Sequence, residues 1–314
     1  MPEWLVEHGI GERRYALVEK GEIVETRVLL DGVIAAGTAL RARLKQVGPP
    51  TIADLGAYEF LLPKGAPGLT EGMVITIEVS REAIPGVEPW KRPLAHVVEG
   101  DCRNPELPEG ETLLFPSPDD RLGQAGWWDL IEEARSGIVA FEGGELRVSV
   151  TPAMTLIDVD GILPPLDLAI SGAQAAARAI RRHGIGGSIG IDLPTIGGKL
   201  DRQAVGDAID AVLPKPFERT AMNGFGFLQI VRPRRHASLF ELAHDRAAFE
   251  ARTLLRRAAF EGPGARRLVA HPAVIKGLQQ RNDWLERLAE QLGGAVSLRV
   301  DPALPISGGY AEKA

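Results

Sequence analysis

From about residue 145 onward, short apolar runs of strand length alternate with longer amphipathic runs of helix length. A strand–helix–strand order needs crossover connections, so this alternation predicts a mixed or parallel sheet with helices packed on it. The expected strands and intervening helices are, in order, strands 146–150 and 154–159, helix 171–183, strand 188–193, helix 200–213, and strands 217–221 and 226–231. A long helix over 238–261 and a last strand–helix–strand unit, with its helix at 272–292, complete a predicted α/β domain at residues 140–314.

A different pattern occupies the first third of the chain. Residues 37–98 contain short strands separated by turns that are rich in glycine and proline, and residues 73–79 alternate from one face to the other. Roughly 60 residues of this kind are typical of a five-stranded barrel of the OB type. Residues 1–36 are expected to form a hairpin that packs on the α/β domain, and residues 99–139 a linker with one short helix. The predicted fold class is therefore α+β, with an OB-type barrel followed by a mixed-sheet α/β domain.

Composition narrows the classes of partner. The 314 residues include 36 basic and 42 acidic side chains, a formal charge of −6, which argues against coating nucleic acid by bulk charge. Arginines recur in clusters that suit either local phosphate contact or ordinary solvated helix faces. The one cysteine, Cys102, excludes a disulfide framework and a multi-cysteine zinc site. No run of about 18 apolar residues occurs, and residues 1–30 lack the apolar centre of a signal peptide, so we predict a cytoplasmic protein without membrane contact.

Acidic side chains at the ends of apolar strands give the strongest indication of chemistry. Asp158 and Asp160 lie two residues apart in a predicted strand, so they share a face, and their apolar neighbours predict that this strand is largely buried. Asp192 ends the next predicted strand, about one crossover unit later. Ligand sites in such sheets lie beyond the carboxyl ends of the strands, so the carboxylates are expected to meet at one edge.

Magnesium suits such a set, with manganese as an alternative. Hard cations of this kind prefer a few carboxylates and keep positions for water and phosphate oxygens. A cation there can activate water and neutralise charge on a phosphodiester. The competing interpretation is that these aspartates cap turns or the helices that follow them. The six histidines show no metal-ligand spacing, and no glycine pair has the spacing of a phosphate loop.

Four stretches of the second half resemble the catalytic region of the ribonuclease E/G family. Residues 143–161 resemble a strand pair that ends in the family motif AIDVN, and residues 186–192 resemble the motif GGLIVIDF. Residues 223–232 look like the motif SRFGLLEMSR, and residues 271–302 are similar to the family's terminal strand–helix–strand unit. The stretches fall in the family's order. The segment 37–98 resembles, more loosely, the family's RNA-binding barrel.

The resemblance implies a magnesium-dependent endonuclease that cleaves single-stranded RNA. The aspartates that hold the metal correspond to Asp158 and Asp192, and Asp160 stands where the family usually has an asparagine, so it is a candidate third ligand. The resemblance also implies RNA-contacting residues, which are Lys91, Phe60, Phe225, Arg232 and Arg234.

Several departures from the family bear on activity. The segment between barrel and α/β domain is too short for the family's 5′-phosphate sensor, and the two-cysteine zinc link is absent, so no zinc and no zinc-mediated oligomer are expected. The motif arginine is Gly224 here, the motif glutamate is Gln229, an acidic position is Thr195, and Ile52 replaces a stacking aromatic. These losses support an alternative, a non-catalytic RNA-binding protein on the same scaffold. A purely structural module is a third interpretation.

Overall fold

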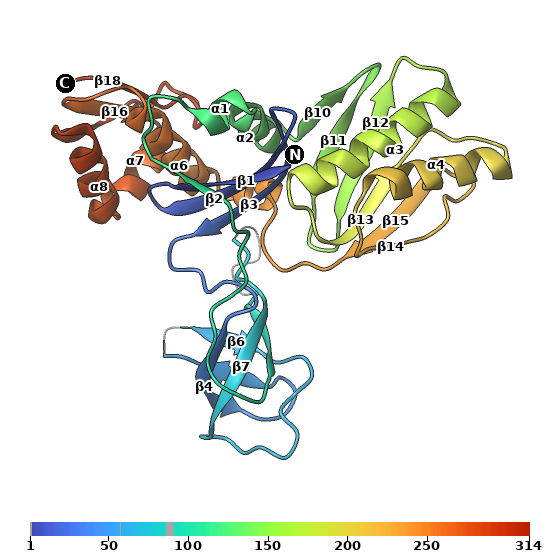
Figure 1. The fold of residues 1–314 in the computed structure, drawn as a ribbon, viewed down its shortest axis with the longest axis horizontal. Helices are drawn as coiled ribbons and strands as arrows, with labels where there is room; N and C mark the ends of the chain where they lie inside the picture. The colour runs from blue at the N-terminus through green and yellow to red at the C-terminus, as the bar shows by residue number, and fades with distance from the viewer. Residues whose placement is uncertain (1, 57, 86–90) are drawn as a thin grey trace. The chain divides into compact units, whose positions relative to one another are not determined.

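The computed structural model describes residues 2–56, 58–85 and 91–314 (Figure 1). Within them, a closed five-stranded barrel and mixed sheets with helices confirm the α+β class. Contacts divide the chain into two compact units, each built from separate segments. Unit 1 comprises Met1–Asp31, Glu109–Asp129 and Leu242–Ala314, and unit 2 comprises Gly32–Pro108 and Leu130–Glu241. This division differs from the predicted domains, because the last seventy or so residues group with the N-terminal strands and not with the α/β sheet.

The barrel in unit 2 matches the position predicted for it. Its strands, in order around the barrel, are β4 (Ala39–Gln46), β5 (Ile52–Asp54), β6 (Glu59–Leu61), β8 (Leu94–Val97) and β7 (Val74–Arg81). Alternate strand residues fill the interior, among them Leu44, Phe60 and Ile77. Phe60 is only 1% exposed. The prediction that Phe60 contacts RNA is therefore wrong, because its ring is a core residue of the barrel.

The second part of unit 2 is a six-stranded mixed sheet. Its strands, in order across the sheet, are β10 (Ile138–Phe141), β11 (Gly144–Val150), β12 (Thr155–Gly161), β13 (Gly187–Asp192), β15 (Phe227–Arg232) and β14 (Glu218–Arg219). Only β12 and β13 run parallel to each other. Two helices, α3 (Pro165–Arg182) and α4 (Lys199–Val212), pack side by side over one face (Figure 1).

The two faces of this sheet differ sharply in burial. Ile157 and Val159 of β12 point toward the helices and are buried, as are Ile189 and Ile191 of β13. The alternate residues of β12, which include Asp158, are exposed. The prediction that this strand is largely buried is therefore wrong, since α3 and α4 cover one face and the other is open to solvent in this chain. The carboxylates of β12 sit on the open face.

Unit 1 contains two smaller mixed sheets. The first has the order β3 (Glu22–Leu30), β2 (Glu12–Glu19), β1 (Glu3–His8), β9 (Glu111–Leu113), and the second has the order β17 (Val296–Val300), β16 (Arg266–Ala270), β18 (Tyr310–Lys313). The helices of this unit are α1 (Arg121–Gln124), α6 (Arg246–Ala259), α7 (Pro272–Gln279) and α8 (Asn282–Leu292). Two helices, α2 (Trp127–Ser136) and α5 (Leu239–His244), cross the division between units. No helix in the described ranges is both long enough and apolar enough to cross a bilayer.

Several element boundaries differ from the sequence prediction for identifiable reasons. The N-terminal hairpin is a three-stranded antiparallel meander. The helix predicted over 238–261 is two helices, because the Asp245 side chain accepts a backbone N–H and starts α6 anew. The helix predicted over 272–292 is likewise divided into α7 and α8. Helix α3 starts at Pro165 and not at residue 171, since proline in the first turn is already set to the helical φ.

A buried ionic network joins the ends of the chain within unit 1. The Glu7 carboxylate accepts hydrogen bonds from Arg14 and from Arg256, whose Nε lies 3.0 Å away. Glu12 accepts from Arg14 Nε at 2.7 Å and from Arg252 Nε at 2.9 Å. All five side chains are nearly inaccessible to solvent. The network ties β1 and β2 to α6, more than two hundred residues later in the chain.

Candidate metal site at one edge of the sheet

The strand register brings together the two aspartates that lie far apart in the sequence. Asp158 of β12 and Asp192 of β13 are direct register partners in neighbouring parallel strands. Adjacent strands lie about 4.8 Å apart, and register partners present their side chains on the same face. Asp160 follows on that face two residues later, and all three side chains are exposed. The edge at which these strands end therefore carries three carboxylates open to solvent.

The electrostatic environment of Asp158 reflects this crowding. Partial burial, followed by the like charges of Asp160 and Asp192, raises the pKa of the Asp158 carboxyl above its ordinary value. Arg147 of β11 is the register partner of Asp158 on the other side and lowers that pKa in part. Its guanidinium pairs instead with Glu145, at 2.7 Å. Within the described part of the chain, no lysine or arginine forms an ion pair with any of the three aspartates.

Helix capping does not account for these aspartates. The N-cap of α3, the helix that follows β12, is Pro164, and the N-cap of α4, which follows β13, is Gly198. Neither cap involves a side-chain hydrogen bond. The alternative that the carboxylates cap the following helices is therefore wrong. Among the described residues, the charges at this edge are offset only in part, by Arg147 and by a backbone hydrogen bond from Val159 to Asp158.

The donor set fits a hard divalent cation held by two carboxylates. Magnesium is usually bound through one or two carboxylates and keeps several waters, which Asp158 and Asp192 match as register partners. Across residues 2–56, 58–85 and 91–314, no three histidine, cysteine, aspartate or glutamate side chains are arranged as a metal group. A preformed three-carboxylate site that includes Asp160 is therefore not present, and the metal proposal rests on the pair.

The loop before β15 is fixed against this edge. The Asn223 side chain accepts the backbone N–H groups of Phe225, at 2.9 Å, and Phe227, at 3.0 Å. Gly226 has φ +97°, and a Cβ there would lie 2.1 Å from the carbonyl oxygen of Leu193, so only glycine permits this approach. Phe225 itself is 85% exposed. Of the predicted RNA-contacting residues, it is the one whose side chain is displayed at the edge that carries the aspartates.

The other predicted RNA-contacting residues have partners inside the protein. Arg232 Nη1 donates to the carbonyl of Ile185 at 3.1 Å. Arg234, which precedes α5, forms an ion pair with Glu241 in the first turn of that helix. Lys91 Nζ lies 3.4 Å from the carbonyl of Pro152. The structure does not gather these three cations around the aspartates, and their contact with RNA stays a prediction.

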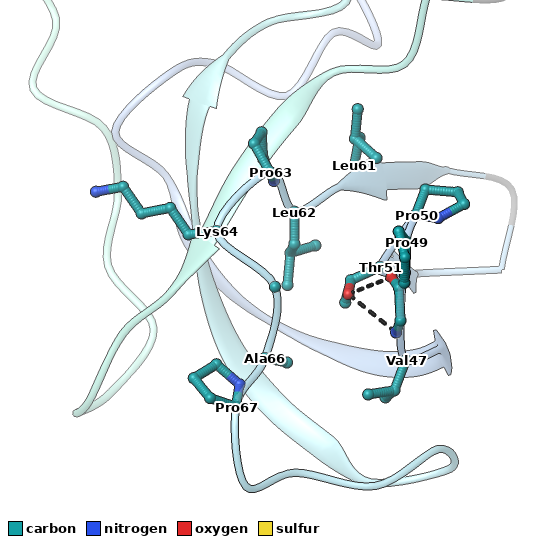
Figure 2. Close-up of a pocket in the computed structure, with 12 residues that line it drawn as sticks. Val47, Pro49, Pro50, Thr51, Leu61, Leu62, Pro63, Lys64, Ala66 and Pro67 are labelled. Atoms are coloured by element: carbon teal, nitrogen blue, oxygen red, sulfur yellow. Dashed lines mark hydrogen bonds between the residues drawn. The ribbon is translucent and has the colours of Figure 1, made fainter.

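The barrel carries a separate hollow on its surface (Figure 2). This groove has a volume of about 490 Å³, and prolines and leucines dominate its lining. The Thr51 hydroxyl donates to the Gly48 carbonyl at 2.8 Å and so stabilises the loop that forms one side of the groove (Figure 2). None of the 12 described residues that line the groove is aromatic. The aromatic stacking pair of the family is therefore not reproduced in this hollow, and Ile52 is a core residue.

Arg147 is the feature of the site that sequence reasoning missed. Its signal lies in the turn at residues 151–154, because the antiparallel register counted back from that turn places Arg147 opposite Asp158.

Comparison of the chain with protein-family models and with curated proteins finds no match. The resemblance to the ribonuclease E/G family therefore stays a prediction.

Proposed function

We propose that this protein is a magnesium-dependent endoribonuclease that cleaves single-stranded RNA. The observation that carries the proposal is the register pairing of Asp158 with Asp192 on an open sheet face, where no ion pair to either carboxylate forms among the described residues. A like-charged pair in this setting is an electrostatic cost unless a cation binds it. RNA supplies the matching chemistry, since its phosphates are anionic and reach a carboxylate edge only through a shared cation.

In this proposal, Asp158 and Asp192 hold the cation, and Asp160 adds negative potential beside them. A bound magnesium ion would neutralise charge on the phosphodiester and lower the pKa of a nearby water. The strands fix the two carboxylates relative to each other, so little reorganisation is needed on binding. Asp158 must be ionised to act as a ligand. Because its pKa is raised, the proposal includes a loss of cation binding and activity as the pH falls toward that value.

The proposal extends to the scaffold as a whole. We take the barrel to be of the OB type, a fold whose surface commonly binds unpaired nucleic acid, and the α/β sheet to be ribonuclease E/G-like. The barrel surface offers exposed basic side chains for the RNA backbone, including Arg41 and Arg43 of β4. Binding through such contacts should weaken as salt rises.

The test is cleavage of an A/U-rich RNA oligonucleotide in millimolar magnesium. We expect Asp158→Asn and Asp192→Asn each to abolish cleavage, and excess EDTA to stop the wild-type protein. Asp207→Asn is the matched control, because Asp207 is an exposed aspartate on α4 and not on the open face of the sheet. Cleavage that survives either substitution or EDTA would exclude the mechanism.

A non-catalytic RNA-binding protein is the second candidate. Two observations favour it. Gly224 leaves open space where the family has an arginine, since nothing lies within 4 Å of the position of its Cβ. Gln229 is neutral and its amide donates to the Ser188 hydroxyl at 2.9 Å, on the same sheet face as the aspartates. Oligonucleotide binding without cleavage in millimolar magnesium would establish this alternative.

A further inference from the structure

The three most exposed large apolar side chains of unit 2 lie in two loops and in the first turn of a helix. Ile162 is 92% exposed, Phe225 is 85% exposed and Leu200 is 79% exposed. Among the described residues of the whole chain, only Leu114 in unit 1 is exposed to a similar degree, at 80%. Scattered exposed apolar residues need no explanation, but a cluster of them marks an interaction site.

Strand topology places these three residues at one edge of the sheet. Ile162 follows the carboxyl end of β12, and Leu200 lies in the first turn of α4, after the loop that leaves β13. Phe225 precedes β15, which is antiparallel to β13, so its loop meets the same edge. This is the edge that carries Asp158 and Asp192. We call Ile162, Leu200 and Phe225 the apolar rim.

Each residue of the apolar rim stands on a fixed backbone. The N–H of Ile162 donates to the Gly143 carbonyl at 3.0 Å. The loop of Phe225 is held to the end of β13 by the Thr195 hydroxyl, which donates to the Phe225 carbonyl at 3.3 Å. Before Leu200, the Arg202 guanidinium donates to the Gly197 carbonyl at 2.7 Å and closes the loop onto the helix. A preorganised display of this kind lowers the entropy lost when a ligand binds.

We infer that the apolar rim binds the unpaired bases on either side of the phosphate that the two aspartates address through a cation. This inference rests on the proposed function and adds the base contacts to it. Single-stranded RNA has apolar base faces along an anionic backbone, which matches apolar side chains around a cation-binding centre. An aromatic ring and two branched aliphatic side chains accept any base by stacking and contact. The rim therefore requires bases next to the cleaved bond without selecting which bases they are.

Charge argues against a second copy of this chain as the occupant. In a two-fold dimer the same patch would face itself. The Asp158, Asp160 and Asp192 carboxylates of one protomer would then oppose those of its partner, and like charges brought together across an interface cost several kcal/mol. An RNA backbone with bound magnesium avoids this repulsion.

The experiment measures cleavage of a fluorescent RNA oligonucleotide by Ile162→Ser, Leu200→Ser and Phe225→Ser. Leu114→Ser is the matched control, since Leu114 is equally exposed but belongs to unit 1. We expect the KM of Phe225→Ser to rise about 5- to 150-fold, the range found for loss of one base-stacking contact, while Leu114→Ser behaves as wild type. Thermal melting checks that each variant is folded. The salt dependence of binding should keep its slope, because no phosphate contact is removed.

An abasic nucleotide placed in turn at each position beside the cleaved bond completes a double-mutant cycle. At the position that Phe225 contacts, the abasic substitution should weaken the wild-type reaction and leave Phe225→Ser unaffected. The inference is overturned if rim variants match Leu114→Ser while the wild-type protein cleaves RNA, which leaves the proposed function intact. It is also overturned if the rim variants change only self-association in sedimentation experiments. Absence of both RNA binding and cleavage by the wild-type protein would overturn the proposed function as well.

Discussion

Repulsion between Asp158 and Asp192 should be measurable as a coupling free energy. The two residues are register partners on an exposed face, so their carboxylates lie about one strand spacing apart, near 5 Å. Two unit charges about 5 Å apart in water interact by about 332/(80 × 5), or about 0.8 kcal/mol, and solvent screening places the value at an exposed site near or below this. Without divalent ions, Asp158→Asn and Asp192→Asn should each stabilise the fold by relieving this repulsion.

The assay is urea unfolding of the wild-type protein, both single variants and the double variant, at pH 7 with EDTA and low salt. The increase in the free energy of unfolding should be about 0.5–0.8 kcal/mol smaller for the double variant than the sum of the increases for the two single variants. This difference should shrink in high salt. Additive effects would refute the reasoning, because two carboxylates that do not sense each other cannot share one cation. With magnesium at about ten times its Kd, the wild-type protein should gain about 1.4 kcal/mol, and each single variant should lose this gain.

Three further predictions concern the barrel core, the surroundings of Asp158 and an ion pair of unit 1. Phe60→Ala should cost about 3–5 kcal/mol in thermal or urea unfolding, because it empties the barrel core, whereas a surface role would leave stability unchanged. Arg147→Gln removes a positive charge beside Asp158, so magnesium binding measured by calorimetry at pH 7 and low salt should tighten about threefold, and unchanged affinity would count against the site. Burial raises the pKa of Asp120 but its bond to Arg256 lowers it further, to a net value below the ordinary one. The stabilisation from ionised Asp120 is therefore present above the unfolded-state pKa and is lost as the pH falls through the folded-state pKa. Asp120→Asn should lower the free energy of unfolding by about 1–2 kcal/mol at pH 7. In unfolding measured across pH, the variant should lose less stability in acid than the wild-type protein does.

The sheet could be predicted because its signals are local and repeated. Each apolar run has strand length, each amphipathic run has helix length, and crossover geometry alone places Asp158 and Asp192 at one edge. The one-sided burial of β12 could not be predicted from its apolar residues. Whether Leu156 is covered depends on which elements lie over that face, and both helices pack on the other one.

The failure at Phe60 has a different cause. Strand β6 has three residues, so its sequence is too short to show which side chains alternate inward. Because the side-chain period is two, an error of one residue exchanges the faces of the strand. Phe60 therefore points into the barrel, while its neighbour Leu61 lines the surface groove. The helix boundary at Asp245 is missed for a similar reason. The apolar periodicity continues through this position, so it does not reveal that the Asp245 side chain caps the start of a new helix.

The three-segment construction of unit 1 has a consequence for the order in which the chain matures during translation. Glu7 and Glu12 leave the ribosome together with Arg14, which pairs with both, but the guanidinium groups of Arg252 and Arg256 that complete their neutralisation are made about 240 positions later. Until then, the first strands carry charged groups that cannot be enclosed without a large desolvation cost. We therefore expect a chain that stops short of α6 to leave these N-terminal strands incompletely packed.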